Sequence, residues 1–589
     1  MPLIQPSRRW NLPGPTPVEA ATLARLLGLP ATAGQLLHTR GMTNPEAVEA
    51  FLNPSPARLH KPDSLPDIGP ATDRVIAAIK RNEVICVHGD YDVDGVTATV
   101  LLVSCLAKLG ARVEYYIPHR EAEGFGLAPN SLEFCRDLGA SLLVTVDCGS
   151  TDHEVTRAAM AAGIDVVITD HHECPPELPE ALAVVNPKRA DSAYPFRELA
   201  GVGVAFKLAW SVLSALGRDR TELTGLLDLV GLGTIADVVP LLEENRVLAR
   251  LGLTAIRNTV RPGLKALLVR AGIAGRPLVE RDVSFGLAPR LNAAGRVDHA
   301  RTGVRLLLTD DPAEAEGLAE RLEDNNRERR RLETGVQRAA IARAEADGID
   351  GRRVLVVAGA DWPAGVLGLV ASRLAERYYR PAIVIGMTDG NGKGSGRSIP
   401  GFDLYAAMAA CADCLKGFGG HRQAGGLTIV AEQVSSFDEV INRYAAGLPD
   451  ELFQPRLDVD AVVPPDELTP DLIEFIRRLE PFGSGNQRPV FAGLGLEVAG
   501  TPRRVGKESN HLKFQLRSGG RTIPAIAWNR SADLPGLEPG RPGALDICFT
   551  VDSRPAPGHE TGLIVKDLRT HPGKDLPDGR PDNPAHPHR

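Results

Sequence analysis

Acidic residues and histidines stand directly after three apolar runs of this sequence. The residues are His88, Asp90, Asp92, Asp94, Asp147, Asp170, His171 and His172. Asp237 adds a further carboxylate at the end of a helical pattern. Carboxylate oxygens with a minority of imidazoles suit Mn²⁺ or Mg²⁺, whereas a structural zinc site would favour cysteine. The pattern therefore indicates a divalent-metal site, with zinc as the weaker alternative because Cys148 and Cys174 stand close by.

Each motif also has an ordinary structural interpretation. Asp90, Asp92 and Asp94 are also suited to turns and helix N-caps, because aspartate favours both and Gly95 permits a tight turn. A calcium-binding EF-hand loop is excluded, because its twelfth position requires glutamate and Leu101 stands there. Unrelated caps have no reason to gather at three strand ends of one sheet. The joint occurrence therefore favours the metal site.

Apolar, β-branched runs alternate with helical patterns between residues 84 and 185. Strands are predicted at Val84–Val87, Val113–Ile117, Leu142–Val146, Val166–Thr169 and Ala183–Val185, and helices at Val96–Lys108, Ser131–Leu138 and Glu154–Ala162. This alternation is typical of βαβ units and of a doubly wound parallel sheet. In such a sheet ligands bind at the carboxyl ends of the strands. The acidic residues and histidines fall at those ends.

Composition limits the class of protein. A chain of 589 residues is too long for one core, and three or four domains are expected. No apolar run is long enough to span a membrane and no secretory signal precedes the first motifs, so a cytosolic protein with reduced thiols is expected. The net charge of −7 argues against a uniformly basic surface, but local basic patches remain compatible with it.

The second half of the sequence changes pattern twice. A long helix rich in Glu and Arg is predicted from Asp310 to Ala346, and a smaller α/β domain with two glycine-rich loops, Gly392–Ser398 and Gly417–Gly426, follows it. Short strands are then predicted at Val490–Phe491, Glu497–Ala499, Leu512–Leu516, Ile523–Trp528 and Asp546–Val551. Five short strands with turns suit an OB-fold, a small barrel that binds single strands.

These motifs resemble the DHH phosphoesterase superfamily, and the chain from about Val84 to about Arg554 resembles its RecJ branch, the bacterial single-strand-specific 5′ exonucleases. Two longer strings, Ala200–Phe206 and Leu287–Arg296, carry the resemblance further. It implies an α/β fold with a parallel-sheet DHH domain, a long connecting helix, a smaller α/β DHHA1 domain and a C-terminal OB-fold β-barrel. The expected limits are an N-terminal helical segment at 1–60, the DHH domain at 61–308, the connecting helix at 309–346, the DHHA1 domain at 347–450, the OB-fold at 451–570 and a disordered tail at 571–589.

The resemblance also implies the roles of the acidic residues and histidines. The expected ligands of two Mn²⁺ or Mg²⁺ ions are Asp92, Asp94, Asp147, His171 and Asp237, with Asp147 as a bridge between the ions. His88 and Asp90 are further candidates, as ligands or as partners of ligands. His172 is expected to face the scissile phosphate, and Asp170 to orient its neighbours. Two ions about 3.5 to 4 Å apart activate water for attack on phosphorus and neutralise charge.

Substrate contacts are expected in the second half and in the string after residue 287. The candidates are Arg290, Asn292, Arg296, Ser395, Arg397, His421 and Arg422, with Arg503, Arg504, Lys507, Lys513 and His511 on the OB-fold. A 5′-terminal phosphate is expected near Ser395, Arg397 and His421, because glycine-rich backbone and arginine suit phosphate oxygens. Trp528 is expected in the barrel core, with a base-stacking surface as the alternative. Pro363 departs from the W-H-x-G-V pattern of the family.

The expected function is a metal-dependent 5′→3′ exonuclease that releases mononucleotides from single-stranded DNA in recombination and repair. The protein is expected to be a monomer. Its implied partners are single-stranded DNA with a 5′ end, a single-strand-binding protein and a helicase. The alternative is a DHH phosphodiesterase of short oligonucleotides or cyclic dinucleotides, which needs no OB-fold. A pyrophosphatase would be shorter, and a non-catalytic replication scaffold would have lost metal ligands.

Overall fold

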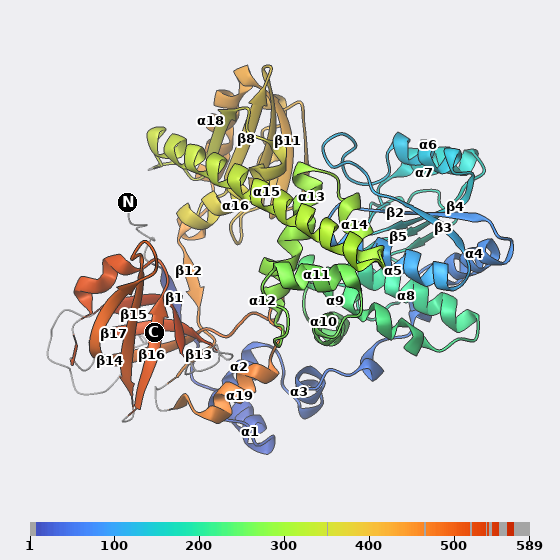
Figure 1. Cartoon of the computed structure of the whole chain (residues 1–589). Helices are drawn as coiled ribbons and strands as arrows, with labels where there is room; N and C mark the ends of the chain where they lie inside the picture. Colours follow the sequence, from blue (N-terminus) through green and yellow to red (C-terminus); the bar gives the residue numbers. More distant parts are fainter. Residues whose placement is uncertain are drawn as a thin grey trace, which may run out of the picture. The chain divides into compact units, whose positions relative to one another are not determined.

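The structure is a computed structural model that describes residues 8–349, 351–463, 467–518, 521–537, 539–540, 545–552 and 562–570 (Figure 1). Contacts divide the chain into two units. Unit 2 holds Pro54–Phe453 and Pro481–Gln487, and unit 1 holds Met1–Asn53, Gln454–Glu480 and Arg488–Arg589. The predicted disordered tail at 571–589 lies outside the described residues.

A five-stranded parallel sheet forms the first part of unit 2. Its strands are β2 (Val84–Gly89), β3 (Arg112–Tyr116), β4 (Ala140–Val146), β5 (Asp165–Thr169) and β6 (Ala183–Val185), in the order β3-β2-β4-β5-β6. Each predicted strand is present, with its ends shifted by at most two residues. Because all five strands are parallel, their carboxyl ends meet at one edge.

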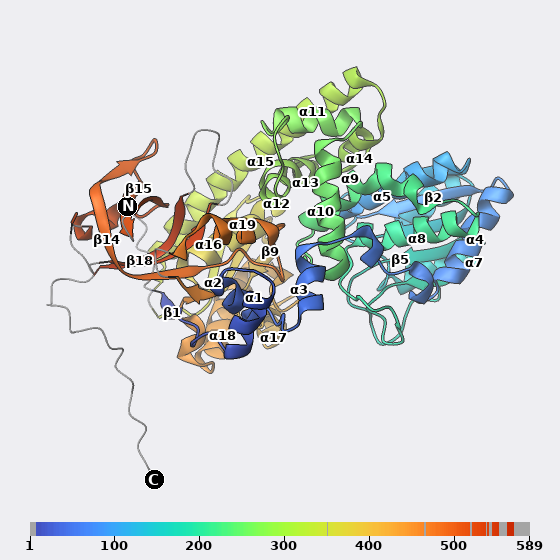
Figure 2. The ribbon, with the colours of Figure 1, turned by 90° about the horizontal axis from the view of Figure 1, so that it is seen from below.

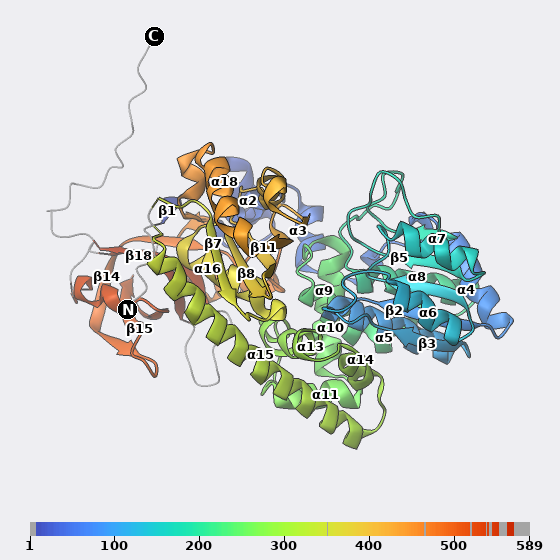
Figure 3. The same ribbon diagram turned by 90° about the horizontal axis from the view of Figure 1, so that it is seen from above.

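Helices cover both faces of this sheet (Figures 1 and 3). Helices α4 (Ile68–Lys80), α5 (Val93–Lys108) and α8 (Gly201–Ala215) lie on one face, and α6 (Pro129–Asp137) and α7 (His153–Ala161) lie on the other. Side chains of β2 alternate accordingly. Ile85 and Val87 join the larger apolar cluster, whereas Cys86 joins the cluster under α6 and α7. The doubly wound parallel sheet is therefore confirmed.

A helical layer connects this sheet to the next one. It contains α9 (Leu227–Ala236), α10 (Glu243–Arg257), α11 (Pro262–Arg270), α12 (Glu280–Asp282), a π-helix (Val283–Leu287), α13 (Ala288–Val297), α14 (Arg301–Leu308) and α15 (Pro312–Ala346). Figure 2 shows α15 running along α11 and α14 toward α16. Asp311 caps α15 by accepting from the backbone of Ala313 at 2.9 Å. No helix among the described residues combines the length and apolar composition that a bilayer crossing requires.

The second sheet of unit 2 is mixed, in the order β10-β11-β9-β8-β7. Its elements are β7 (Leu355–Ala360), α16 (Ala364–Tyr378), β8 (Ala382–Thr388), β9 (Asn391–Arg397), α17 (Leu404–Ala409), β10 (Gly417–Gly420), β11 (Ala424–Val430) and α18 (Val434–Ala446). The prediction of glycine-rich loops was wrong for most of these residues, because Gly392–Arg397 lies in β9 and Gly417–Gly426 forms the hairpin of β10 and β11, whose turn is residues 421–423. A Cβ at Gly394 would lie 2.8 Å from Leu427, so its neighbours' apolar side chains occupy the space that a side chain would need.

A barrel makes up most of unit 1. Its strands are β13 (Ala461–Val462), β14 (Phe491–Val505), β15 (His511–Ser518), β16 (Arg521–Ala527), β17 (Leu545–Val551) and β18 (Leu563–Thr570), and β14 closes onto β17. This closure confirms the OB-fold. The strand expected at Glu497–Ala499 is the middle of β14, and β18 was not predicted. Trp528 is 50% exposed, so its expected place in the core was wrong.

The N-terminal segment belongs to the same unit as the barrel. Strand β1 (Arg9–Asn11) pairs in parallel with β12 (Arg456–Asp458). The indole of Trp10 donates to Asp567 at 2.8 Å, and Arg569 lies 4.2 Å above its ring. Helices α1 (Val18–Leu26), α2 (Ala31–Thr39) and α3 (Pro45–Leu52) follow, and α2 contacts α19 (Pro470–Arg478). Segments that are far apart in the sequence thus form one unit.

Candidate metal centre and phosphate pocket

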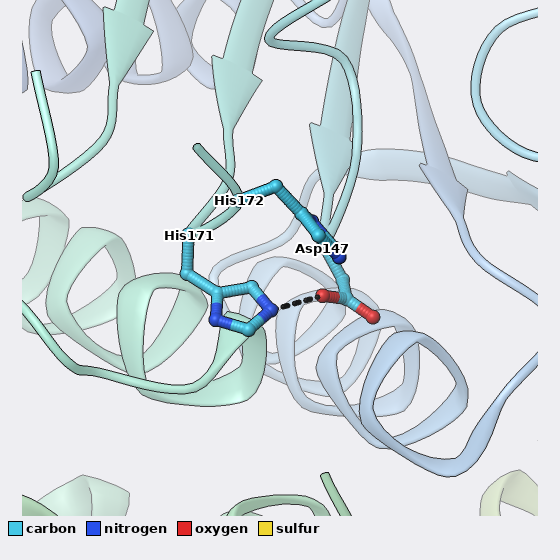
Figure 4. Close-up of side chains that lie close together, drawn as sticks. All are labelled: Asp147, His171 and His172. Carbon is cyan, nitrogen blue, oxygen red and sulfur yellow. Dashed lines mark ion pairs between the residues drawn. The ribbon is translucent and has the colours of Figure 1, made fainter. Parts of the chain in front are cut away.

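Three predicted carboxylate ligands gather around one imidazole nitrogen of a fourth, His171. His171 Nε2 lies 3.1 Å from Asp147 Oδ1, 3.6 Å from Asp237 Oδ2 and 4.0 Å from Asp94 Oδ2. Figure 4 shows the His171 ring turned toward the Asp147 carboxylate, with His172 on the same loop. The side chains come from the ends of β4, β5 and α9 and from the first turn of α5. Residues far apart in sequence therefore converge at the carboxyl edge of the sheet.

A second group of acidic residues lies beside the group around His171. Ligand atoms of Asp90, Asp92 and Asp147 lie within 4.8 Å of one another, as do those of Asp94, His171 and Asp237. Asp147 also groups with His171 and His172 by the same measure. Asp147 therefore belongs to two of the three groups.

Backbone geometry and missing side chains make room for these carboxylates. Asp147 follows β4 with a left-handed φ of 64°, and its backbone N–H donates to Thr169 at 3.0 Å. A Cβ at Gly201 would lie 2.5 Å from Asp147 Oδ1. Asp94 in turn accepts from the backbone of Gly201 at 2.6 Å and of Val202 at 2.9 Å. The Ala200–Phe206 string thus places the N-terminus of α8 against two carboxylates.

Asp92 is also a helix N-cap, as its ordinary structural interpretation predicted. Asp92 caps α5, because its Oδ1 accepts from the backbone of Asp94 at 2.9 Å and of Gly95 at 3.2 Å. A Cβ at Gly95 would lie 2.5 Å from the backbone nitrogen of Asp90. Capping and membership of the acidic group are therefore compatible, since the cap turns the carboxylate toward the site.

Unsatisfied polar atoms and crowded negative charge indicate that this site holds cations. Among the described residues, Asp90 Oδ1, Asp147 Oδ1 and both ring nitrogens of His171 are buried without a hydrogen-bond partner. Burial, together with the charges of Asp94 and Asp92, raises the pKa of Asp237 to about 9. Burial and Asp92 raise the pKa of Asp94 to about 7. Oxygen-rich, partly imidazole surroundings of this kind fit Mn²⁺ or Mg²⁺.

These pKa values predict how metal affinity depends on pH. Asp94 and Asp237 must lose their protons to bind a cation, so Mn²⁺ affinity is expected to rise from about pH 6 to about pH 9. The folded pKa values lie above the ordinary 3.8, so without metal these groups contribute less stability as the pH rises from about 4 to about 9. Calorimetric titration with Mn²⁺ and melting curves in a chelator test both trends. Affinity that is constant with pH would contradict the assignment.

A separate network orients His172. Asp170 accepts from the backbone of Ser150 at 3.0 Å and of His171 at 2.7 Å, and from His172 Nδ1 at 2.8 Å. Burial alone would raise the pKa of Asp170, but its hydrogen bond with His172 and the nearby imidazoles bring that pKa below its usual range. Burial lowers and the Asp170 carboxylate raises the pKa of His172, with a net rise. The His172 side chain is 36% exposed and can reach a substrate.

The structure does not bring His88 into these groups. Its Nε2 lies 3.0 Å from Ser131 Oγ, and its Nδ1 lies 3.6 Å from Cys148 Sγ. The ring is fully buried, and burial lowers its pKa to about 4. His88 therefore packs beneath the site as a neutral side chain, whereas Asp90 stays with the acidic residues.

A pocket of about 510 Å³ adjoins the second sheet of unit 2. Its lining includes Arg120, Lys393, Ser395 and Phe418. Arg397 donates to Ser395 Oγ at 3.2 Å. Burial lowers the pKa of Arg397, and the charge of Arg120 lowers it further. Positive charge is concentrated here, which favours an anion.

Arg120 is a site residue that the sequence motifs did not identify. It follows β3, and its guanidinium lies 4.7 Å above the ring of Tyr91, which stands between Asp90 and Asp92. Burial, followed by the charges of Arg120, Arg329 and Arg397, lowers the pKa of Arg296 to about 9. The position of Arg120 after a strand at the carboxyl edge is the signal that could have found it.

Several predicted substrate contacts have other roles or lie elsewhere. Arg290 is buried and donates to Glu323 and to the carbonyl of Gly286, both at 2.5 Å, which ties α13 to α15. Arg296 donates to the carbonyl of Gly365 at 2.8 Å. Asn292 is half-buried. His421 and Arg422 are exposed between β10 and β11, outside the pocket lining. The exposed candidates on the barrel are Arg503, Arg504, Lys507 and Lys513.

Family models match three parts of the chain. Residues 84–234 match the DHH family, N-terminal domain, residues 351–447 match the DHHA1 domain and residues 459–561 match the RecJ OB domain. These matches cover the first sheet, the second sheet and the barrel up to β17.

Relatives match nearly the whole chain. The single-stranded-DNA-specific exonuclease RecJ of Bacillus subtilis is 39% identical over 535 residues, which cover 90% of this chain and 67% of that protein. The protein of the same name from Dickeya dadantii is 38% identical over 528 residues, which cover 85% of this chain and 89% of that protein. The crystal structure of RecJ in complex with Mn²⁺ from Thermus thermophilus superposes with a TM-score of 0.81 at 31% identity and covers 96% of this chain and 80% of that chain. The same protein with Mg²⁺ gives a TM-score of 0.76 at 29% identity and covers 96% and 79%.

Proposed function

The chain belongs to the RecJ family of single-stranded-DNA-specific exonucleases, and we propose that it removes nucleotides one at a time from the 5′ end of single-stranded DNA. The residues of the metal centre fit Mn²⁺ or Mg²⁺, the ions present in the Thermus thermophilus structures. Its expected ligands, Asp92, Asp94, Asp147, His171 and Asp237, are brought together by the fold. Phosphodiester hydrolysis is therefore the reaction that this site performs.

Different residues of the chain contribute to different steps of hydrolysis. Two ions held by the ligands would activate water and neutralise the charge that develops on the phosphate. His172 is held by Asp170 through Nδ1, so its Nε2 is the atom left to hydrogen-bond the phosphate or the leaving 3′ oxygen. Asn186 fixes the same loop by donating to the carbonyl of His172 at 2.9 Å.

The observation that supports the 5′ polarity is the position of Arg120. Its guanidinium lines the cationic pocket and also packs on Tyr91, beside the acidic residues. With the terminal phosphate bound in the pocket, the next phosphodiester of the strand would reach the metal centre. A strand entering in the opposite direction would present a 3′ hydroxyl, which gains nothing from the cations.

Digestion of end-labelled DNA tests the proposal. The protein is expected to release labelled mononucleotide at once from a 5′-labelled single strand, and to release 3′ label only after complete digestion. Release requires Mn²⁺ or Mg²⁺. Attack on dinucleotides alone would favour the alternative of a DHH phosphodiesterase, and equal loss of both labels would reject the polarity. The barrel, which such a phosphodiesterase does not need, favours the exonuclease.

Arg120→Ala is expected to reduce the preference for a 5′-phosphorylated over a 5′-hydroxyl strand by about 10- to 100-fold, because a charge-assisted contact contributes about 1.5 to 3 kcal/mol. The ratio of kcat/KM for the two substrates measures the effect. Arg422→Ala is the matched control, since Arg422 belongs to the same unit, is exposed and lies outside the pocket lining. Equal ratios for wild type and Arg120→Ala would reject the pocket as the end-binding site.

We also propose that the protein acts as a cytosolic monomer in recombination and repair, with a single-strand-binding protein and a helicase that supply the strand. Family membership supports this setting, and the exposed cations of the barrel support DNA contact. Arg503 stands opposite Lys513 across β14 and β15, and both are exposed. Loss of strand affinity in Arg503→Ala and Lys513→Ala, measured against salt concentration, tests the barrel contact.

A further inference from the structure

A second pocket lies beside the phosphate pocket, the 510 Å³ pocket described above. The volume of this outer pocket is about 670 Å³, which falls within the range of sites for small organic molecules. The two linings share Glu121, Ala364, Lys393 and Thr428, so the two pockets adjoin. The space beyond the proposed position of the 5′ phosphate is therefore open and not closed by protein.

Strand register places both pockets on one face of the second sheet. Lys393 of β9 pairs with Gly386 of β8 and with Thr428 of β11, and all three residues line the outer pocket. Ser395, two residues further along β9, lines the phosphate pocket. Because side chains alternate between the two faces of a strand, Lys393 and Ser395 point to the same side. The outer pocket therefore continues the phosphate pocket along β9, toward Asn391 at the start of that strand.

One wall of the outer pocket is built on paired glycines. Gly359 of β7 lies opposite Gly386 of β8. A Cβ at Gly386 would clash with the backbone oxygen of Trp362, and one at Gly359 would clash with its indole ring. Trp362 therefore packs directly on the sheet, and it lines the pocket together with Pro363. Because Pro363 stands where the W-H-x-G-V pattern has histidine, this wall carries no imidazole.

The lining of the outer pocket carries both signs of charge. Lys393 and Lys416 are exposed, and Lys416 Nζ donates to Asn391 Oδ1 at 2.6 Å. No carboxylate of the described residues forms an ion pair with either lysine. Asp361 and Glu121 add two carboxylates. Lysine suits phosphate oxygens, whereas carboxylates and amides suit sugar hydroxyls and base edges, and an indole suits a base. A nucleoside with one phosphate therefore fits better than a bare polyphosphate, which the carboxylates would repel.

We propose that the outer pocket binds a nucleoside that caps the 5′ end of a strand through a pyrophosphate bridge. This inference rests on the proposed function. The first phosphate of the strand lies in the phosphate pocket, Lys393 and Lys416 bind the second phosphate, and the capping nucleoside lies against Trp362.

The bond that is hydrolysed is the same as in an uncapped strand. Water attacks the phosphorus between the first and the second nucleotide, the bond from that phosphorus to the 3′ oxygen breaks, and the oxygen takes up a proton. The pyrophosphate bridge stays intact. The first product is therefore a dinucleoside diphosphate, and the remaining strand begins with an ordinary 5′ phosphate.

Digestion of two matched strands tests the inference. A single strand with a 5′ monophosphate is compared with the same strand carrying adenosine through a 5′,5′ pyrophosphate bridge, both in Mn²⁺. Wild type is expected to digest the capped strand with a kcat/KM within about tenfold of that for the monophosphate, because the reacting phosphodiester is unchanged. Mass spectrometry is expected to identify the dinucleoside diphosphate as the first product.

The outcomes separate this inference from the proposed function. Resistance of the capped strand while the monophosphate strand is digested would overturn the inference, and so would adenosine monophosphate as the first product. Absence of digestion of both strands would instead reject the function.

Lys416→Ala separates a bound cap from one that only extends into solvent. Lys416 lines the outer pocket but not the phosphate pocket. Its substitution is expected to lower kcat/KM for the capped strand by about tenfold, through loss of a charge-assisted contact, and to leave the monophosphate strand unchanged. Lys265→Ala is the matched control, because Lys265 is an exposed lysine of the same unit that lines neither pocket. Equal kcat/KM values of wild type and Lys416→Ala on the capped strand would overturn the inference. Melting curves show that each variant is folded.

Discussion

Substitution of Asp147 by asparagine is expected to abolish exonuclease activity while raising the melting temperature of the metal-free protein. The carboxylate is 2% exposed, and its pKa is well above the usual range because of burial and of the charges of Asp94, Asp92, Asp237 and Asp90. If Asp147 is the shared ligand that we propose, its loss removes several kcal/mol of transition-state stabilisation, which corresponds to a decrease in kcat of at least about 10³-fold.

The melting temperature is expected to rise although activity is lost, because the substitution removes one of several negative charges that are buried close together. Asparagine has the same shape and tolerates the left-handed backbone at φ 64°. A gain of about 1 kcal/mol would raise the melting temperature of unit 2, which has about 400 residues, by about 1 °C. Melting curves at about pH 8, with a chelator and with Mn²⁺, measure it, and Mn²⁺ is expected to stabilise the variant less than the wild type.

Asp228→Asn is the control for this sign. Asp228 is also buried, but it accepts from Thr259 at 2.7 Å and forms an ion pair with Arg261 at 3.2 Å. Its substitution is expected to lower the melting temperature, since the half-buried Arg261 loses its ion-pair partner. If Asp147→Asn destabilised the metal-free protein as Asp228→Asn does, the crowding of charge at the metal centre would be contradicted.

Asp170→Asn is expected to lower kcat by about 10²- to 10⁴-fold, the range for a misplaced acid–base group, with little change in KM. The carboxylate accepts three backbone hydrogen bonds, from Ser150 at 3.0 Å, His171 at 2.7 Å and His172 at 3.1 Å, besides the one from the His172 ring. An amide in its place must turn one N–H group toward these donors, which displaces the His172 ring.

Single-turnover rates of Asp170→Asn, His172→Ala and the double variant test this coupling. Because Asp170 acts through His172, the double variant is expected to be no slower than His172→Ala alone. Multiplied losses would show independent roles and contradict the coupling. Mn²⁺ affinity of Asp170→Asn, measured by calorimetry, shows whether His171 has kept its place.

Local patterns were sufficient to predict the first sheet and its site. Val84, Leu142 and Val166 begin or extend apolar runs that are strands in the structure, and Asp147 and His171 follow such strands. The convergence follows from one rule, that parallel strands end at the same edge. This rule places the acidic residues and histidines that follow the strands at one edge, whereas the choice of metal ligands, Asp237 at the end of α9 included, was implied by the family resemblance.

Tertiary contacts explain where the predictions were wrong or incomplete. Gly394 is in a strand because Leu427 fills the space beside it, and Arg290 is bound to Glu323 on a helix that begins 22 residues later in the chain. Trp528 lies on the barrel surface against His511, at a ring distance of 4.6 Å. Composition cannot distinguish a bound arginine from a free one, or a buried tryptophan from an exposed one. Arg120 was missed for the related reason that its partner, Tyr91, is distant in sequence.

The pairing of β1 with β12 has a consequence for biosynthesis. Arg9, Trp10 and Asn11 are synthesised before every element of unit 2, but their partners at Arg456–Asp458 follow its long segment Pro54–Phe453, and Asp567 follows all of it. At about 5 to 20 residues per second, this wait lasts roughly half a minute to two minutes. The continuous part of the chain between these segments can fold during that time. A segment that is made early is therefore among the last to reach its final position, and the barrel unit is completed only after Asp567 has left the ribosome.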